Sequence, residues 1–306
     1  MVYTFTPNPS LDYMIKMLRL THDVVNRSLE EKVIAGGKGL NVARMLKAFD
    51  VPVKVLAVTA GYAGKWWTDM VRSEGIDVQC VELAEGETRI NVKLTGVENT
   101  EINARGPLVP TELKPAIYDM INQVKDGDIL VICGMGTPDM RNVAYANMVD
   151  LVADRDVKVI IDSSGESMRL ALPKCPYLIK PNLRELEDLG NTSIDSPAEA
   201  LDCMERIIRM GTRNVLLSMG QDGALWVGED GVKLRALAPK GREINAVGAG
   251  DSMLAAFIYA MINKMEVKEA FRLSVAAGSA TAFSEGFVTR DEVYALLDRV
   301  TVEERL

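Results

Sequence analysis

The chain has 306 residues, of which 48% are hydrophobic, and its formal net charge is −8. This length and composition suit one large α/β domain, or a large domain that carries a smaller insert. The acidic balance argues against nucleic-acid binding, because a nucleic-acid backbone requires a basic face. It does not exclude a phosphorylated metabolite that is held by a few well-placed cations.

Targeting signals and reactive side chains narrow the possibilities further. The longest apolar stretch, Met253–Ile262, is shorter than the ~20 residues that span a bilayer, and the N-terminus lacks a secretory signal. We therefore expect a cytoplasmic protein without a membrane partner. The four cysteines lie far apart, which predicts buried thiols and neither a disulfide nor a zinc site. Because His22 is the single histidine, a general base is expected to be a carboxylate.

The first third of the chain contains two kinds of pattern. Leu11–Val33 holds short strand-like pieces without a clear helix. The apolar run Val53–Val58 then predicts a buried strand, and the patterns of Leu40–Phe49 and Lys65–Ser73 predict helices on either side of it.

Arg89–Thr95 alternates strictly between apolar and polar residues, as a strand with one buried face does. A second candidate strand, Thr100–Ala104, follows a polar turn at Glu98–Asn99. Together with residues 11–33, these segments predict a small antiparallel β lid. We assign residues 11–33 and 88–106 to the lid, and residues 1–10, 34–87 and 107–306 to an α/β domain.

The apolar residues of the alternating strand are Ile90, Val92 and Leu94. A thin lid cannot bury both of its faces alone, and an exposed sheet edge is a liability unless it is paired or covered. This stripe predicts a homodimer in which two lids pack together.

The rest of the chain alternates apolar strands with helices. The predicted strands are Ile129–Cys133, Val157–Ile161 and Val215–Leu217, and the predicted helices are Leu113–Val124, Asn142–Ala153, Ala198–Met210, Asp251–Asn263, Lys268–Ser284 and Arg290–Val300. Strands that are apolar on both faces and alternate with helices indicate a mostly parallel central sheet with helices on both faces. The expected fold class is α/β.

Ala35–Asn41 reads AGGKGLN, between a strand-like segment and a predicted helix. Its glycines allow the backbone to approach a ligand closely, and Asn41 can form hydrogen bonds with sugar hydroxyls. The motif lacks the GK[ST] of a Walker loop and the GxGxxG of dinucleotide folds. The alternative interpretation is an ordinary turn in which Lys38 is a solvated lysine.

Two further motifs are weak when each is taken alone. In Lys180–Glu185, Asn182 and Glu185 share one face of a helix start, which suits Mg²⁺ held through water. When this motif is considered alone, the alternative interpretation, a helix-capping box, is favoured. Ser218–Gly223 is a tight turn after a strand; it can close over nucleotide phosphates or simply connect two strands.

Asn245–Ser252 reads NAVGAGDS and leads directly into an apolar helix. Free N–H groups at a helix start form an anion site, which here would stabilise charge on a transferred phosphoryl group. Asp251 could accept the proton of an attacking hydroxyl. We expect the helix dipole to lower its pKa, which a late proton transfer tolerates. The alternative is that Asp251 merely caps the helix.

These four motifs, in this order and together with Thr6–Asp12, resemble the phosphofructokinase B family of the ribokinase superfamily over essentially the whole chain. The resemblance implies a ribokinase-like fold with ATP and Mg²⁺ as cofactors. It makes Asp251 the catalytic base and Gly248, Ala249 and Gly250 the anion hole. It assigns Asn182 and Glu185 to the metal, Ser218, Gly220 and Gly223 to the nucleotide, and Asp12, Gly37, Lys38 and Asn41 to the sugar.

Within the family, Val25–Arg27, Thr88–Lys93 and Thr100–Asn103 resemble first the 1-phosphofructokinase branch and second the tagatose-6-phosphate kinase branch. This implies an ATP-dependent kinase that converts fructose 1-phosphate to fructose 1,6-bisphosphate, or one that acts on tagatose 6-phosphate. Arg27 and Arg89 would clamp the phosphate of the substrate, a task that suits guanidinium groups. The alternative is that both arginines are solvated.

The sequence departs from the family at Cys133–Pro138, where Met135 replaces a serine that contacts the substrate, and at Ala246. Met135 keeps open a non-catalytic sugar-phosphate sensor on the same fold. A dinucleotide oxidoreductase is the third hypothesis, although the GxGxxG spacing is missing.

Overall fold

The computed structural model describes residues 1–96, 100–137, 140 and 144–304. Its central feature is a ten-stranded sheet in the order β14-β13-β12-β11-β10-β9-β8-β1-β4-β5. The strands are β1 (Val2–Thr6), β4 (Val53–Ala60), β5 (Asp77–Leu83), β8 (Ile129–Cys133), β9 (Lys158–Asp162), β10 (Leu178–Ile179), β11 (Asn214–Ser218), β12 (Ala224–Gly228), β13 (Lys233–Leu237) and β14 (Thr301–Glu303). From β5 to β11 neighbouring strands are parallel, and from β11 to β14 they are antiparallel. The mostly parallel sheet is confirmed.

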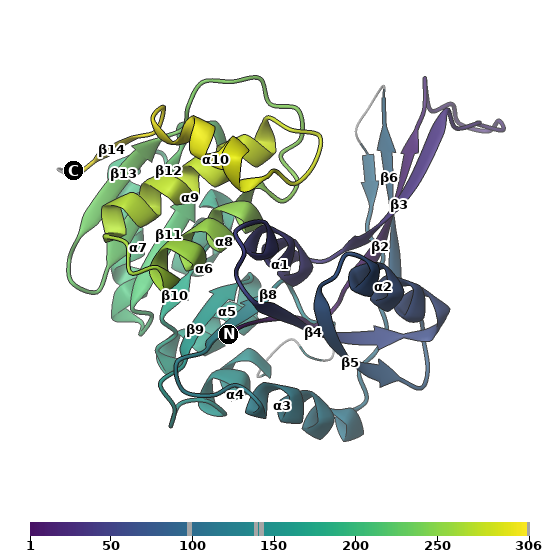
Figure 1. Cartoon of the computed structure of the whole chain (residues 1–306), viewed down its shortest axis with the longest axis horizontal. Coiled ribbons are helices and arrows are strands. Elements are labelled where there is room, and N and C mark those ends of the chain that lie inside the picture. The colour runs from purple at the N-terminus through teal and green to yellow at the C-terminus, as the bar shows by residue number, and fades with distance from the viewer. Residues whose placement is uncertain (97–99, 138–139, 141–143, 305–306) are drawn as a thin grey trace.

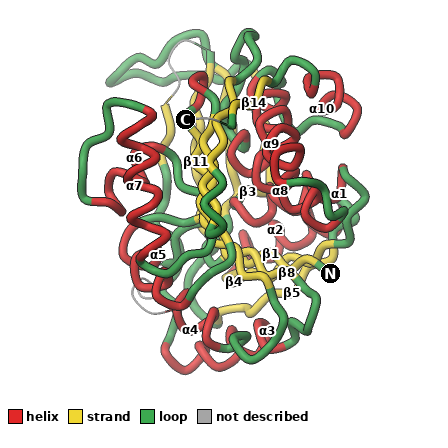
Figure 2. The backbone as a smooth tube through the Cα atoms, turned by 90° about the vertical axis from the view of Figure 1, so that its left-hand side faces the viewer, coloured by secondary structure: helices red, strands yellow, loops and turns green. Residues whose placement is uncertain are grey.

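Helices cover both faces of this sheet (Figures 1 and 2). One layer consists of α3 (Lys114–Asn122), α4 (Ala144–Asp150), α5 (Gly165–Ala171), α6 (Leu183–Gly190) and α7 (Pro197–Arg209), and it shares a core with the sheet. The other consists of α1 (Lys38–Ala48), α8 (Ala249–Ile262), α9 (Val267–Ala282) and α10 (Arg290–Leu297) around a second core. A third cluster lies beneath α2 (Gly61–Ser73). Short 3-10 turns occur at Thr111–Leu113, Leu172–Lys174 and Gly220–Asp222.

The lid is a separate four-stranded sheet in the order β3-β2-β6-β7, which stands beside the main domain (Figure 1). Its strands are β2 (Ser10–Lys16), β3 (Glu30–Gly36), β6 (Arg89–Thr95) and β7 (Thr100–Ile102). The pairs β2–β3 and β6–β7 are antiparallel, as expected, whereas β2 and β6 pair in parallel. This parallel pair joins two segments that are distant in the sequence.

The alternation of β6 separates the two faces of the lid. Asn91 is only 5% exposed and donates a hydrogen bond to Asp12, so the polar residues face inward. Ile90 is 49% exposed on the opposite face. The inner face of the lid is therefore the polar one, and the apolar stripe faces outward.

The structure also differs from the sequence-based expectations. The strands β1, β5, β10, β12, β13 and β14 and the helix α5 were not predicted. Of the four cysteines, Cys133 and Cys203 are buried, but Cys80 is half-buried and Cys175 is exposed, so the expectation of buried thiols was wrong for these two. The predicted turn at Glu98–Asn99, the residue Pro138 and the first two residues of the predicted helix Asn142–Ala153 lie outside the described residues. No helix within the described ranges is long and apolar enough to cross a membrane.

Candidate active site at two glycine-rich helix starts

Two of the sequence motifs, far apart in the chain, meet where α1 and α8 begin. Each helix starts after a glycine with positive φ, Gly37 at 130° and Gly248 at 81°, and such angles favour glycine over other residues. Asn41 on the first turn of α1 donates a hydrogen bond of 2.8 Å from Nδ2 to Oδ2 of Asp251 on α8. The contact fixes the orientation of the carboxylate.

Asp251 is buried, with only 6% of the residue exposed. Burial raises the pKa of this carboxyl, and the nearby negative charge of Asp162 raises it further, to about 6. The positive charge of Lys38 and the hydrogen bond from Asn41 oppose these effects without cancelling them. The expectation of a lowered pKa was therefore wrong, because burial and Asp162 outweigh the helix dipole. A carboxylate with a pKa near 6 is a better proton acceptor than an ordinary aspartate.

Asp162, at the end of β9, has no solvent exposure and lies next to two lysines. Lys38 Nζ lies 3.0 Å from its Oδ1, and Lys180 Nζ lies 3.3 Å from its Oδ2. Burial acts to raise the pKa of Asp162, but the two ammonium groups hold it below its ordinary value. Conversely, the charge of Asp162 raises the pKa of Lys38. Lys38 is thus paired with a buried carboxylate, while 39% of its side chain remains exposed.

Sequence reasoning did not identify Asp162 as a functional residue. The available signal was its position immediately after the predicted strand Val157–Ile161. Side chains at the carboxyl ends of parallel strands meet at one edge of the sheet, where α/β proteins bind their ligands.

Asn182 and Glu185 form the capping box of α6. Glu185 N donates to Asn182 Oδ1 and Asn182 N donates to Glu185 Oε2, both at 2.9 Å. The capping interpretation is confirmed. The second oxygen of Glu185, Oε1, lies 3.9 Å from Lys38 Nζ, so this carboxylate also faces the buried cluster. Among the described residues, no group of three or more His, Cys, Asp or Glu side chains could hold a metal ion.

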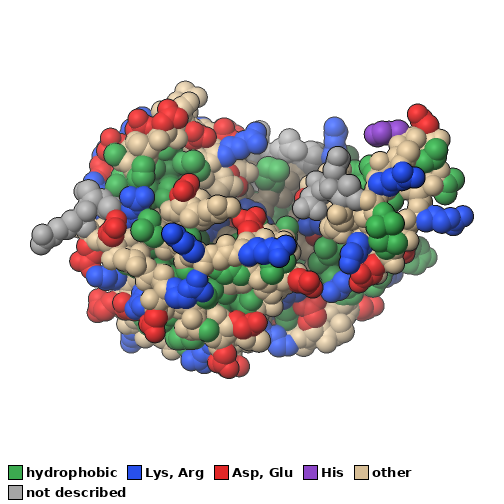
Figure 3. Space-filling model, turned by 90° about the horizontal axis from the view of Figure 1, so that it is seen from above, with side chains coloured by type: hydrophobic (Ala, Val, Ile, Leu, Met, Phe, Trp, Pro, Cys, Tyr) green, Lys and Arg blue, Asp and Glu red, His purple; other side chains and the backbone are tan. Residues whose placement is uncertain are grey.

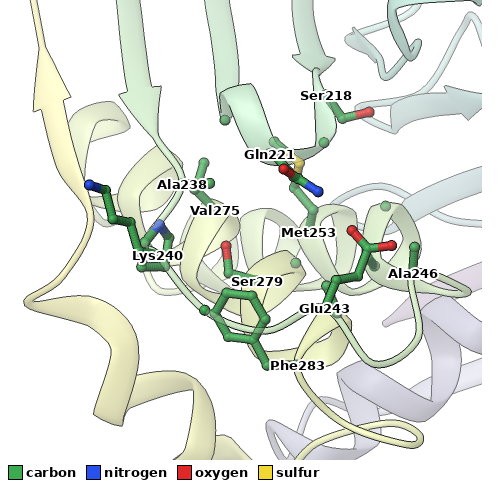
Figure 4. Close-up of a pocket in the computed structure, with 18 residues that line it drawn as sticks. Ser218, Gln221, Ala238, Lys240, Glu243, Ala246, Met253, Val275, Ser279 and Phe283 are labelled. Atoms are coloured by element: carbon green, nitrogen blue, oxygen red, sulfur yellow. The ribbon is translucent and has the colours of Figure 1, made fainter.

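A cavity of about 450 Å³ opens beside the start of α8 (Figure 4). Ser218, Gly220 and Gly223, which the sequence assigned to the nucleotide, line it. The opposite wall comes from the loop before α8 and from α9; its labelled side chains include Lys240, Glu243, Ser279 and Phe283. Ala249 and Gly250 also line the cavity, which therefore extends to the helix turn that carries Asp251.

On the lid side, Asp12 is held by three polar neighbours. Its Oδ1 accepts hydrogen bonds from Ser10 Oγ at 2.8 Å and from Asn91 Nδ2 at 2.9 Å, and its Oδ2 lies 3.1 Å from Lys93 Nζ. Gly36 leaves room for this arrangement, because a Cβ at this position would lie 2.6 Å from Ser10 Oγ and 2.9 Å from the Asp12 carboxyl. Lys93 is a cation on the inner face of the lid that sequence reasoning did not select.

The two arginines assigned to the substrate phosphate lie in different settings. Arg89 is half-buried, and its guanidinium donates to the backbone oxygens of Asn8 at 3.2 Å and Ala104 at 3.5 Å. Arg27 is exposed in the connection between β2 and β3, at the far end of the lid strands.

Met135 is also exposed. Seen from above (Figure 3), the surface is indented between the lid and the main domain.

Comparisons of the sequence and of the fold with known proteins point to one group of proteins. The sequence pattern of the pfkB family carbohydrate kinases matches residues 6–292. The chain is 37% identical to a 1-phosphofructokinase of Bacillus subtilis over 302 residues, 99% of each protein. It is 34% identical to a D-tagatose-1-phosphate kinase of Bacillus licheniformis over 94% of each protein. The phosphofructokinase-2 of Escherichia coli, solved with fructose-6-phosphate, superposes with a TM-score of 0.90 at 25% identity, covering 97% of this chain and 98% of the other.

Proposed function

Because this chain belongs to the pfkB family of carbohydrate kinases, we propose that it transfers the γ-phosphate of ATP to the 6-hydroxyl of a ketohexose 1-phosphate. Fructose 1-phosphate is the first candidate substrate, and fructose 1,6-bisphosphate is then the product. The observation that carries the proposal is the position of Asp251. This buried carboxylate lies on the helix turn that ends the nucleotide cavity, and Asn41 orients it.

The position of the phosphate on the substrate follows from the relatives. Two similar proteins are named for ketohexoses with a phosphate on carbon 1, a 1-phosphofructokinase and a D-tagatose-1-phosphate kinase. Fructose and tagatose differ only in the configuration at carbon 4, and their 1-phosphates share a free 6-hydroxyl. The second candidate substrate is therefore D-tagatose 1-phosphate, in place of the tagatose 6-phosphate expected from the sequence.

In the proposed reaction, Asp251 accepts the proton of the 6-hydroxyl as that oxygen attacks the γ-phosphate. The N–H of Gly250, in the first turn of α8, stabilises the charge on the transferred group, and the N–H of Ala249, which donates to Ala246 O at 3.2 Å, would join it by exchanging that acceptor. Asp12, Gly37 and Asn41 hold the sugar, and Ser218, Gly220 and Gly223 border the nucleotide. The assembled base and glycine turn favour a catalyst over a non-catalytic sensor.

The substrate phosphate requires a cation at the other end of the sugar. We assign Arg27 and Arg89 to it, with Lys93 as a third candidate on the inner face of the lid. Lys93 lies 3.1 Å from Asp12 and 3.7 Å from Glu101, so these carboxylates hold its ammonium group beside the sugar site.

Mg²⁺ is the metal that this chemistry requires, and it supplies charge neutralisation to the nucleotide phosphates. Asn182 and Glu185 fit water-mediated contact with the ion better than direct coordination. Asn182 Oδ1 and Glu185 Oε2 already accept the hydrogen bonds of the capping box, whereas Glu185 Oε1 faces the site.

We also propose that the protein is a homodimer through the outer face of the lid. Ile90 and Ile102 are exposed on the strands β6 and β7, and Val92 and Leu94 are half-buried on the same sheet. A two-sided sheet of four strands with one apolar face is stable when a second sheet covers that face.

The substrate assignment is tested by the rate of ADP release with fructose 1-phosphate, D-tagatose 1-phosphate, fructose 6-phosphate, tagatose 6-phosphate and fructose. We expect the highest kcat/KM with one of the two 1-phosphates. A preference for a 6-phosphate or for unphosphorylated fructose would contradict the assignment. The Asp251→Asn variant controls for contaminating kinases.

A further inference from the structure

Two lysines from different segments converge on one buried carboxylate. Lys38 is the first residue of α1, and Lys180 follows β10, yet both ammonium groups lie within 3.3 Å of Asp162 at the end of β9. Lys180 is only 4% exposed. Burying charged groups is costly unless they pair with one another or bind a ligand. This arrangement is therefore a candidate for a functional role.

The ammonium groups lie next to the point of phosphoryl transfer. A Cβ added to Gly250 would lie 3.1 Å from Lys180 Nζ, and Gly250 lines the nucleotide cavity. Lys180 is thus beside the helix turn that the proposed reaction assigns to the transferred phosphate. Lys38 approaches from the opposite motif, on the helix that also carries Asn41.

A lysine has a long flexible stem and three N–H donors. Fixing such a side chain costs conformational entropy, and a rigid acceptor offsets that cost before the ligand arrives. Asp162 is such an acceptor, because it ends a central strand of the parallel sheet and has no solvent exposure. It engages one side of each ammonium group and leaves other donors for phosphate oxygens.

We propose that Asp162 is a positioning residue for phosphoryl transfer: it fixes Lys38 and Lys180 so that their ammonium groups bind the terminal phosphates of the nucleotide. This inference rests on the proposed kinase function and adds a pair of fixed cations to the anion site of α8. It assigns a role to Lys38 that differs from sugar binding.

The first test measures nucleotide affinity by calorimetry without sugar and without metal, using ATP and adenosine as probes. In Lys38→Met and Lys180→Met, we expect ATP to bind about ten- to a hundred-fold more weakly, the range for a lost charge-assisted contact. Adenosine affinity should not change, because adenosine carries no phosphate. The matched control is Lys54→Met, whose ammonium lies 3.8 Å from Asp77 at the start of β5.

The second test uses the pH dependence of kcat, which reports whether the charges of Asp162 and Lys38 are held beside Asp251 in the working enzyme. The charged and titratable groups facing Asp251 are Asp162, Lys38, Lys180 and Cys133. Asp162 raises the pKa of Asp251 and Lys38 lowers it. The acidic limb should therefore move to lower pH in Asp162→Asn and to higher pH in Lys38→Met, while the plateau falls in both variants.

Several outcomes would overturn the positioning role. They are an unchanged ATP affinity in both lysine variants, an equal loss for adenosine and ATP, or acidic limbs that shift in the same direction. If Asp162→Asn does not fold, the ATP affinities of the two lysine variants still test the positioning role. Each of these variants keeps Asp162 together with one lysine as its counter-ion. Failure of the wild type to phosphorylate any sugar would refute the proposed function instead, and the ATP and adenosine comparison would still stand.

Discussion

Replacing Asp251 with Asn should make the protein more stable while it removes turnover. The pKa of this carboxyl rises from its ordinary value of 3.8 to about 6 on folding, because of burial and the charge of Asp162. An acid whose pKa is raised on folding contributes its full stability to the native state at a pH below the pKa of the unfolded chain. That contribution is lost as the pH rises through the pKa of the folded protein. At about 1.4 kcal/mol per pH unit, the ionised carboxylate costs the native state about 3 kcal/mol at pH 8.

The amide introduced by the Asp251→Asn substitution would carry no charge and can still accept the hydrogen bond from Asn41 Nδ2. We therefore expect urea unfolding to show a stability gain of about 1.5 kcal/mol at pH 5 and about 3 kcal/mol at pH 8. Turnover should fall by roughly 10²–10⁴, the usual contribution of a positioned general base. The matched control, Asp69→Asn on the exposed side of α2, should change stability by less than about 0.5 kcal/mol.

Two results would refute this reasoning. Equal or lower stability of Asp251→Asn at pH 8 would mean that the site does not penalise the charge. A gain that is the same at pH 5 and pH 8 would mean that ionisation is not its cause.

Three other predictions concern the rest of the site. Arg27→Ala and Arg89→Ala should each lower kcat/KM for the phosphosugar about ten- to a hundred-fold with little change in KM for ATP; unchanged values in both would remove the arginines from the phosphate site. Val92→Lys should place a charge on the outer face of the lid and give monomers in sedimentation at micromolar concentration, whereas a wild type that is already monomeric would contradict the dimer. Gly223 has a φ of 89° and a Cβ there would collide with the backbone oxygen of Ala236, so Gly223→Ala should lower Tm and weaken ATP binding, and normal ATP affinity would argue against the turn as part of the nucleotide site.

The architecture was predictable where local patterns are strong. The apolar runs at Val53–Val58 and Ile129–Cys133, with helices between them, indicated the parallel sheet, and both runs are strands. The strands β12 to β14 were missed because they are only three to five residues long, and because β14 pairs with β13, a partner that is distant in the sequence. Their short segments carry no clear period of their own.

The residues of the site were easier to predict from the sequence than their pKa values. The sequence identified Asn41 and Asp251, and the structure joins them by a hydrogen bond. It also suggested a low pKa for Asp251, because the dipole of α8 is the effect that is visible locally. Burial reverses that result, together with the charge of Asp162, which lies on a strand about 90 residues earlier in the chain. Electrostatic effects of this kind depend on three-dimensional burial, which motif spacing does not encode.

We expect the chain to transfer the γ-phosphate of ATP to the 6-hydroxyl of a ketohexose 1-phosphate. Phosphorus NMR of the wild-type protein with ATP, Mg²⁺ and fructose 1-phosphate tests this reaction. We expect the γ-phosphate signal to be replaced by ADP and by a second sugar phosphomonoester signal equal in intensity to the first, with no such change in Asp251→Asn. Release of inorganic phosphate alone, or an unchanged spectrum with both fructose 1-phosphate and D-tagatose 1-phosphate, would contradict the claim.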